Sequence, residues 1–233
     1  MTEVDILVLA GGLGTRLGSL LGDAPKILAP VSGRPFLHYL LRWLAGQGAG
    51  RVVLGLGYRA GPALAYLAEH SFPPLEVVPV AEPSPLGTAG AIGFALPSLR
   101  TDPVLVMNGD TFLDADLSAF VTSHRTARAA ASVLCVQAAD SRRYGRVEMD
   151  ASGRVVRFEE KGPVAVPGSW INAGAYLLDR TVLERIARLR RGSLERDVLP
   201  AMPPGSIHAC RTSGRFLDIG TPEDLALAAT LLP

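Results

Sequence analysis

Cysteine, charge of one sign and long apolar runs are scarce or absent in this chain of 233 residues. Its 2 cysteines, Cys135 and Cys210, are too few for a disulfide framework and lack the spacing of metal ligands. The formal net charge is +1, without a block of like charges, which argues against nucleic-acid binding as the main activity. No stretch approaches the ~18 apolar residues of a membrane span, and acidic Glu3 and Asp5 argue against a secretory signal. We therefore expect a soluble cytoplasmic protein that binds neither nucleic acid nor membranes.

Apolar residues make up 48% of the chain, enough for a sizeable core, and no linker or repeat interrupts it. Strand and helix patterns alternate in the first half, which predicts an α/β fold with a mainly parallel central sheet and helices on both faces. We expect one domain, residues 1–233, with halves at about 1–125 and 126–233. The predicted strands are residues 6–9, 51–54, 75–80, 103–107, 131–137, 171–178 and 216–219, with a hairpin of 145–149 and 155–160. The predicted helices are residues 36–44, 62–69, 88–96, 182–190 and 194–201, with further helices from 117 and after 221.

A glycine-rich loop follows the first apolar run, in the sequence LAGGLGTRLG from Leu9 to Gly18. Glycines 11, 12 and 14 let backbone N–H groups approach a polyphosphate closely. Arg16 and Lys26 follow the loop. The guanidinium of arginine is a forked phosphate ligand, and the ammonium of lysine is a compact point charge. The loop fits neither the dinucleotide fingerprint nor the phosphate loop of ATPases. It indicates a site for a nucleoside triphosphate, the alternative being a tight turn after a strand.

Two aspartates are candidate magnesium ligands. Asp110 ends the apolar run 103–107, where an α/β sheet presents groups to its cleft, and Asp218 lies inside the apolar stretch 216–219. Mg²⁺ prefers oxygen ligands and is held by one or two carboxylates together with substrate phosphates. The alternatives are a turn or cap for Asp110 and a structural salt bridge for Asp218. The nearby Asp114 and Asp116 are better explained by capping of the following helix.

Further polar groups suit substrate recognition. Glu160 and Lys161 end a predicted strand, where they can accept hydrogen bonds from hydroxyls and bind a second anion, or form a solvated charge cluster. Asn172 suits hydroxyl recognition, or merely a bulge. Glu82 begins a rigid proline-containing loop, and its carboxylate can accept two hydrogen bonds from the N1–H and N2–H₂ edge of guanine, which adenine does not offer.

Several segments, taken in order, resemble those of the sugar-1-phosphate nucleotidyltransferases. They are LAGGLGTRL, PKILAPV (25–31), PLGTAGAI (85–92), NGD (108–110), YGRVEMD (144–150), FEEK (158–161), INAGAYLL (171–178) and FLDIGTPEDL (216–225). The resemblance spans essentially the whole chain. RLGSLLGDAPK lacks the proline usual in the family soon after the arginine-leucine pair. With PLGTAGAI and FLDIGTPEDL, this makes the chain most similar to the D-glycero-D-manno-heptose 1-phosphate guanylyltransferases.

This resemblance implies a Rossmann-like nucleotidyltransferase fold with a smaller sugar-binding β portion. It implies that a sugar 1-phosphate, with heptose 1-phosphate favoured, attacks the α-phosphorus of a nucleoside triphosphate, with GTP favoured, and releases pyrophosphate. The implied catalytic residues are Arg16, Lys26 and Lys161, and the implied Mg²⁺ ligands are Asp110 and Asp218. The implied nucleotide-binding residues are Leu9, Ala10, Gly11, Gly12, Gly14, Thr15, Glu82, Pro85, Gly87 and Thr88. The implied sugar-phosphate-binding residues are Asn108, Gly109, Gly145, Glu160, Lys161 and Asn172.

Three alternatives stay open. The same chemistry can serve mannose, glucose or N-acetylmuramic acid 1-phosphate with another triphosphate such as UTP. A glycosyltransferase that uses nucleotide sugars has a similar cleft, and Asp114-Ala115-Asp116 matches its Asp-x-Asp motif in letters. A nucleotide-sensing module keeps the loop without reactivity, against which the full set of cations and acids argues. A homo-oligomer is possible. Family members with a trailing acyltransferase β-helix are longer, so we expect no second activity.

Overall fold

The structure is a computed structural model that describes residues 1, 3–12, 17, 21, 24–57, 59–138, 140–159 and 161–232. Its main strands are β1 (Ile6–Ala10), β4 (Arg51–Leu56), β5 (Glu76–Ala81), β6 (Val104–Asn108), β8 (Ala131–Ala138), β9 (Arg146–Met149), β10 (Val155–Glu159), β11 (Ser169–Leu178) and β12 (Ile207–Thr212). Short strands are β2 (Pro30–Val31), β3 (Arg34–Pro35), β7 (Thr111–Leu113) and β13 (Phe216–Asp218). The helices are α2 (Phe36–Gly46), α3 (Gly61–Glu69), α4 (Gly87–Ala95), α5 (Leu117–Ala127), α6 (Arg180–Ala187) and α7 (Pro222–Leu231).

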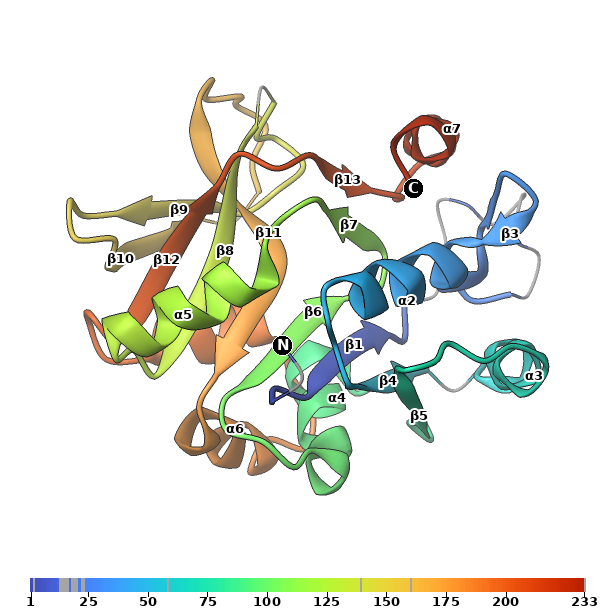
Figure 1. Ribbon diagram of the computed structural model, residues 1–233. Coiled ribbons are helices and arrows are strands. Elements are labelled where there is room, and N and C mark those ends of the chain that lie inside the picture. The colour runs from blue at the N-terminus through green and yellow to red at the C-terminus, as the bar shows by residue number, and fades with distance from the viewer. Residues whose placement is uncertain are drawn as a thin grey trace.

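The fold is α/β with a mostly parallel central sheet, as predicted. The sheet runs in the order β10-β9-β11-β6-β1-β4-β5, and β8 and β12 branch from β11 (Figure 1). β5, β4, β1 and β6 are parallel, so their carboxyl ends meet at one edge, where Leu9 of β1 lies beside Asn108 of β6. β11 runs antiparallel to β6, β8 and β9 and joins the two halves of the chain in one sheet.

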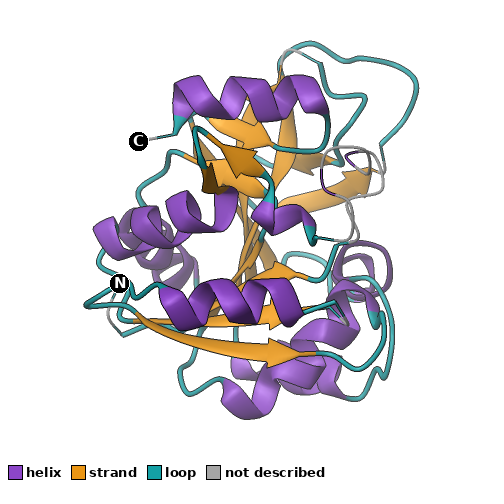
Figure 2. Ribbon diagram, turned by 90° about the vertical axis from the view of Figure 1, so that its right-hand side faces the viewer, coloured by secondary structure: helices purple, strands orange, loops and turns teal. Residues whose placement is uncertain are grey.

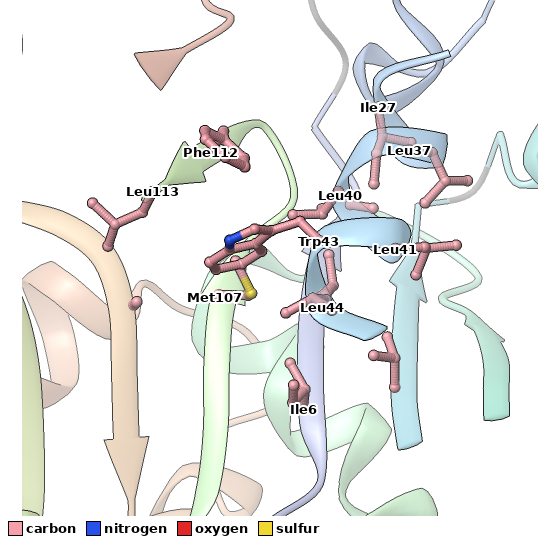
Figure 3. Packing of buried hydrophobic residues seen from close by; sticks show 14 of the residues in the cluster. Ile6, Ile27, Leu37, Leu40, Leu41, Trp43, Leu44, Met107, Phe112 and Leu113 are labelled. Carbon is pink, nitrogen blue, oxygen red and sulfur yellow. The ribbon is translucent and has the colours of Figure 1, made fainter. Parts of the chain in front are cut away.

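Helices cover both faces of the sheet (Figure 2). β1 is apolar throughout because alternate side chains enter different cores. Ile6 and Val8 belong to the core that includes residues of α2, α3, α5 and α7, while Leu7 belongs to the core that includes residues of α4 and α6. Trp43 of α2 meets Phe112 of β7 edge to face at 5.4 Å between ring centroids, in the core that also includes Met107 (Figure 3). This packing holds α2 and β7 against the strands whose ends carry the site.

The predicted hairpin is confirmed, since β9 and β10 pair antiparallel around a turn at residues 150–154. The prediction of a regular helix over residues 194–201 is wrong. The segment forms one π-helical turn, Leu194–Val198, and one 3-10 turn, Leu199–Ala201. Pro200 lacks an N–H donor and its ring collides with the carbonyl one turn earlier, so an α-helix does not continue through it.

Several strands differ from the prediction. The sequence analysis missed β12, which pairs parallel with β8, and the short strands β2, β3 and β7. The predicted strand at 216–219 exists as β13, but it pairs with β7 in a separate small sheet instead of extending the main one. Among the described residues, no helix combines the length and apolar character that a membrane span requires.

Candidate active site

A pocket of about 540 Å³ opens where the parallel strands β1 and β6 end. Gly11 and Gly12 follow β1, and Gly109 and Asp110 follow β6, so the segments carrying these residues come together here. We call this cavity the nucleotide-side pocket, after the residues that the resemblance assigns to the nucleotide. Of the predicted site residues, it is lined by Leu9, Ala10, Gly11, Gly12, Lys26, Glu82, Pro85, Gly87, Thr88, Asn108, Gly109 and Asp110. The predicted Gly14, Thr15, Arg16 and Glu160 lie outside the described residues.

Lys26 connects the two candidate metal ligands. It lies in a short 3-10 turn, Lys26–Leu28, and its side chain is 12% exposed. Its Nζ donates to Asp110 Oδ2 at 2.6 Å and to Asp218 Oδ1 at 3.2 Å. Asp218 comes from β13, which reaches the site because Asp218 is paired in register with Thr111, the residue after Asp110. Residues far apart in the sequence thus form one charged group.

The acid pair suits a divalent cation. Two carboxylates and one ammonium leave a net charge of −1, and the donors are the oxygens that Mg²⁺ prefers. Burial raises the pKa of Asp218, while Lys26 acts in the opposite direction. Within the described part of the chain, no three His, Cys, Asp or Glu side chains gather as a metal site. The residues therefore fit an ion held by two carboxylates and completed by substrate phosphates.

Glu82 is buried beside the glycine loop. Its side chain begins where β5 ends, and a Cβ added at Gly11 would lie 3.0 Å from its Oε1. Its Oε2 is buried without a hydrogen-bond partner among the described residues. Burial raises the pKa of this carboxyl, and a backbone hydrogen bond from Leu86 acts in the opposite direction. A buried acceptor of this kind is normally met by a donor, from water or from a ligand.

The first turn of α4 forms another wall of the nucleotide-side pocket. Gly87 has φ +76°, and a Cβ there would overlap the carbonyl oxygen of Gly192. Ala89 N donates to Gly192 O, and Gly192 N donates to Leu86 O, each at 3.0 Å. Glycine at position 87 is therefore required by backbone conformation and close approach.

A second pocket, of about 820 Å³, adjoins the first and shares Asn108 with it. We call it the sugar-side pocket, after the residues that the resemblance assigns to the sugar phosphate. Of the predicted residues, Asn108, Gly145, Lys161 and Asn172 line it, whereas Gly109 lines only the nucleotide-side pocket. The sequence analysis missed further lining residues, among them Arg143, Tyr144, Phe158, Glu159, Gly174, Tyr176, Ser193, Glu195, Arg196 and Pro200. Several of these residues had a signal, because they lie inside the motifs YGRVEMD, FEEK and INAGAYLL, whereas Arg143 and the residues of segment 193–200 lie outside every quoted motif.

Arg143 adds a cation to the sugar-side pocket near the acid pair. Its Nη2 lies 2.5 Å from Asp224 Oδ2 in the first turn of α7 and 3.9 Å from Asp218 Oδ2. The hydrogen bond to Asp224 raises the pKa of this guanidinium, so the group stays charged. Arg143 thus ties the loop before β9 to α7.

Asp114 and Asp116, which match the Asp-x-Asp motif, line neither of the two pockets. Asp116 caps α5, with Oδ1 accepting from Ala119 N at 2.9 Å. Asp114 pairs with Arg215 at 3.3 Å. The capping explanation is therefore confirmed for Asp116, and this motif offers no support for a glycosyltransferase.

A family model described as Nucleotidyl transferase matches residues 6–232. The chain belongs to this family. The mannose-1-phosphate guanylyltransferase of Mycobacterium tuberculosis is 39% identical to this nucleotidyl transferase over 225 residues, which are 95% of this chain and 62% of that protein. This nucleotidyl transferase therefore spans less than two thirds of the mycobacterial relative. The D-glycero-alpha-D-manno-heptose 1-phosphate guanylyltransferase of Campylobacter jejuni is 35% identical over 221 residues, 94% of this chain and 95% of that protein.

Solved structures agree with the fold of this nucleotidyl transferase. The crystal structure of HddC from Yersinia pseudotuberculosis has a TM-score of 0.87 and 36% identity, covering 97% of this chain and 98% of that chain. A crystal structure of the same protein complexed with GMP-PN also has a TM-score of 0.87. The predicted resemblance to sugar-1-phosphate nucleotidyltransferases is confirmed, and the chain is an enzyme of this class.

Proposed function

We propose that this nucleotidyltransferase joins GTP and a sugar 1-phosphate, with D-glycero-D-manno-heptose 1-phosphate favoured, to give GDP-sugar and pyrophosphate. The observation that carries the proposal is the junction of two pockets at Asn108, beside the Lys26–Asp110–Asp218 group. Residues 1–125 contribute most of the nucleotide side, and residues 126–233 most of the sugar side. The heptose 1-phosphate guanylyltransferase relatives, at 31–35% identity, support the sugar and the base.

In the proposed reaction, an oxygen of the sugar 1-phosphate attacks the α-phosphorus of GTP. A new P–O bond forms, the bond from the α-phosphorus to the bridging oxygen breaks, and pyrophosphate leaves with its electron pair. The attacking phosphate is already ionised, so no general base is required. Catalysis then depends on positioning and charge neutralisation.

The chain's own cations and backbone N–H groups contribute to that neutralisation. Two anions about 4 Å apart repel by roughly 4 kcal/mol at an effective dielectric of 20. Lys26 would contact the triphosphate and Lys161 the sugar phosphate, while Gly11 and Gly12 allow backbone N–H groups close to the phosphates. Asp110 and Asp218 would hold Mg²⁺, which supplies further positive charge to the phosphates.

Glu82 is the proposed reader of guanine. Its unpaired, buried oxygen is suited to the N1–H and N2–H₂ donors of that base. Asn172 and Gly145 would meet sugar hydroxyls, together with Glu160. The proposed substrates are highly charged metabolites made inside the cell, so the proposal places the reaction in the cytoplasm.

The test is a matrix of four nucleoside triphosphates against several sugar 1-phosphates, scored by pyrophosphate release with Mg²⁺. We expect release only when both substrates are present, with GTP preferred and heptose 1-phosphate the best acceptor. A second candidate acceptor, mannose 1-phosphate, rests on the 39% identity to the mycobacterial relative. No pyrophosphate with any pair, or release without a sugar phosphate, would contradict the proposal.

A further inference from the structure

A chain of hydrogen bonds runs from the nucleotide-side pocket to the sugar-side pocket through Glu195. On one side, Thr88 Oγ1 donates to Glu195 Oε2 at 2.9 Å. On the other, the hydroxyl of Tyr176 donates to Glu195 Oε1 at 3.0 Å and accepts from Asn172 Nδ2 at 2.7 Å. Thr88 lines the first pocket, and the other three residues line the second. The chain therefore connects both proposed substrate sites through four side chains.

The direction of each hydrogen bond is determined by the carboxylate. An ionised carboxylate only accepts, so the single hydroxyl proton of Tyr176 must point to Glu195. The oxygen of Tyr176 then accepts the N–H of Asn172. Asn172 Oδ1 in turn accepts from Gly174 N at 2.9 Å, which leaves one orientation of the amide. Tyr176 is 1% exposed, so water does not replace these partners.

The hydrogen bonds at the nucleotide-side end of this network also have fixed directions. Thr88 Oγ1 accepts from Leu194 N at 2.7 Å, so its proton is directed to Glu195. Ser193 Oγ donates to the same Oε2 at 2.9 Å. The π-helical turn over 194–198 begins at these residues, and the backbone around Gly192 is bonded to the first turn of α4. Displacement of that turn would therefore move Glu195.

We propose that Glu195 is a positioning residue that orients the Asn172 amide toward a sugar hydroxyl and, through Thr88, couples the sugar-side pocket to the nucleotide-side pocket. This rests on the proposed function, because Asn172 is assigned to the sugar. Its consequence is that a change at Thr88, in the nucleotide-side pocket, weakens binding of the sugar phosphate.

Glu195→Gln tests the direction of the hydrogen bonds between Glu195, Tyr176 and Asn172. A glutamine can donate to the Tyr176 hydroxyl, whose own proton then points at the Nδ2 of Asn172. The amide must then move away from this hydroxyl, or turn over and lose its hydrogen bond from Gly174 N. We expect the KM for the sugar 1-phosphate at saturating GTP to rise by up to about tenfold, the effect of one lost hydrogen bond between the neutral Asn172 amide and a sugar hydroxyl. The KM for GTP should stay within about twofold, and the melting temperature should change little because the side chains have the same shape.

Thr88→Val and Thr88→Ser form the matched pair. Valine removes the hydroxyl and serine keeps it, so valine alone should raise the KM for the sugar 1-phosphate at saturating GTP. The double variant Thr88→Val/Tyr176→Phe should show less than the product of the two single effects, because both break one chain. Thr122→Val on α5, whose hydroxyl bonds only Ser118 O among the described residues, serves as the control for a threonine lost elsewhere.

An unchanged sugar-phosphate KM in Thr88→Val would overturn the inference, as would multiplicative single effects in the double variant. The Thr88 variants still provide this test if Glu195→Gln does not fold. Failure of the proposed function is a separate result, since the unsubstituted enzyme would then release no pyrophosphate from any sugar phosphate.

Discussion

Lys26→Met tests the charged group at the junction of the two pockets. Methionine keeps much of the length of lysine but removes the ammonium, which donates to Asp110 at 2.6 Å and Asp218 at 3.2 Å. The two carboxylates then face each other without a cation, and the phosphates lose a positive group. The substitution should therefore affect both stability and turnover, by amounts that can be separated.

The stability loss follows from burial. A hydrogen bond to a charged group contributes about 1.5–3 kcal/mol. The side chain of Asp110 is 39% exposed and is screened by water, whereas that of Asp218 is 23% exposed, so most of the effect arises at Asp218. We expect about 2 kcal/mol, or roughly 4–8 °C in melting temperature for a chain of this size. Loss of one preorganised charge should lower kcat by about 10²–10³.

The pH dependence distinguishes this cause from a packing defect. Burial already raises the pKa of Asp218, and removal of Lys26 removes an opposing effect, so the pKa rises further. A group with a raised pKa favours the folded state below its unfolded pKa and loses that contribution as pH rises through its folded pKa. The stability deficit of Lys26→Met should thus be largest near neutral pH and shrink in acid.

Thermal unfolding across pH and pyrophosphate release at saturating substrates are the assays. Lys26→Met/Asp218→Asn is the matched variant. It should recover stability, because a neutral amide replaces the unpaired charge, without recovering turnover. Near-normal kcat in Lys26→Met, or a stability deficit that does not vary with pH, would refute the reasoning.

Three further predictions concern single residues. Glu82→Gln should reduce the preference for GTP over ATP by about 10–100-fold, since a charged acceptor for two guanine donors is lost; an unchanged ratio of kcat/KM values would show that the base is read elsewhere. Because a proton competes with the ion at Asp218, whose pKa is raised, the Mg²⁺ concentration for half-maximal activity should rise as pH falls, and Asp218→Asn should raise it at every pH. Equal Mg²⁺ requirements in the two proteins would contradict the assignment. Gly87→Ala should destabilise the protein by at least about 1–3 kcal/mol, because position 87 combines a positive φ with overlap against Gly192 O; an unchanged denaturation midpoint would be inconsistent with this geometry.

The parts of the fold that were predictable from the sequence carry strong local patterns. β1 and the first four residues of β6 are apolar runs, a glycine follows each strand, and the parallel arrangement follows from strand–helix alternation. β12 was missed because IHACRT mixes polar and small residues and so lacks a clear strand pattern. Its strand conformation is stabilised by pairing with β8. The pairing of β13 with β7 was likewise not visible locally, because a short apolar strand does not specify its partner.

Some residues of the candidate site were likewise predictable from the sequence, and others were not. Lys26, Glu82 and Asp110 sit at loop positions next to strands or in motifs, so the sequence indicates them directly. Glu195 lies 107 positions from Thr88, its partner, in a segment whose pattern suggested an ordinary helix. Only the packing of α4 against that segment brings them together. Contacts of this range depend on tertiary structure, which local periodicity does not encode.

The most direct test of the central claim is ³¹P NMR of GTP mixed with heptose 1-phosphate, Mg²⁺ and the enzyme. The account predicts that the two substrate signals fall together while a diphosphate ester and pyrophosphate appear in equal amounts, and that Lys26→Met slows this by about 10²–10³. Loss of the GTP signals to GDP and inorganic phosphate, with the sugar phosphate signal unchanged, would contradict it.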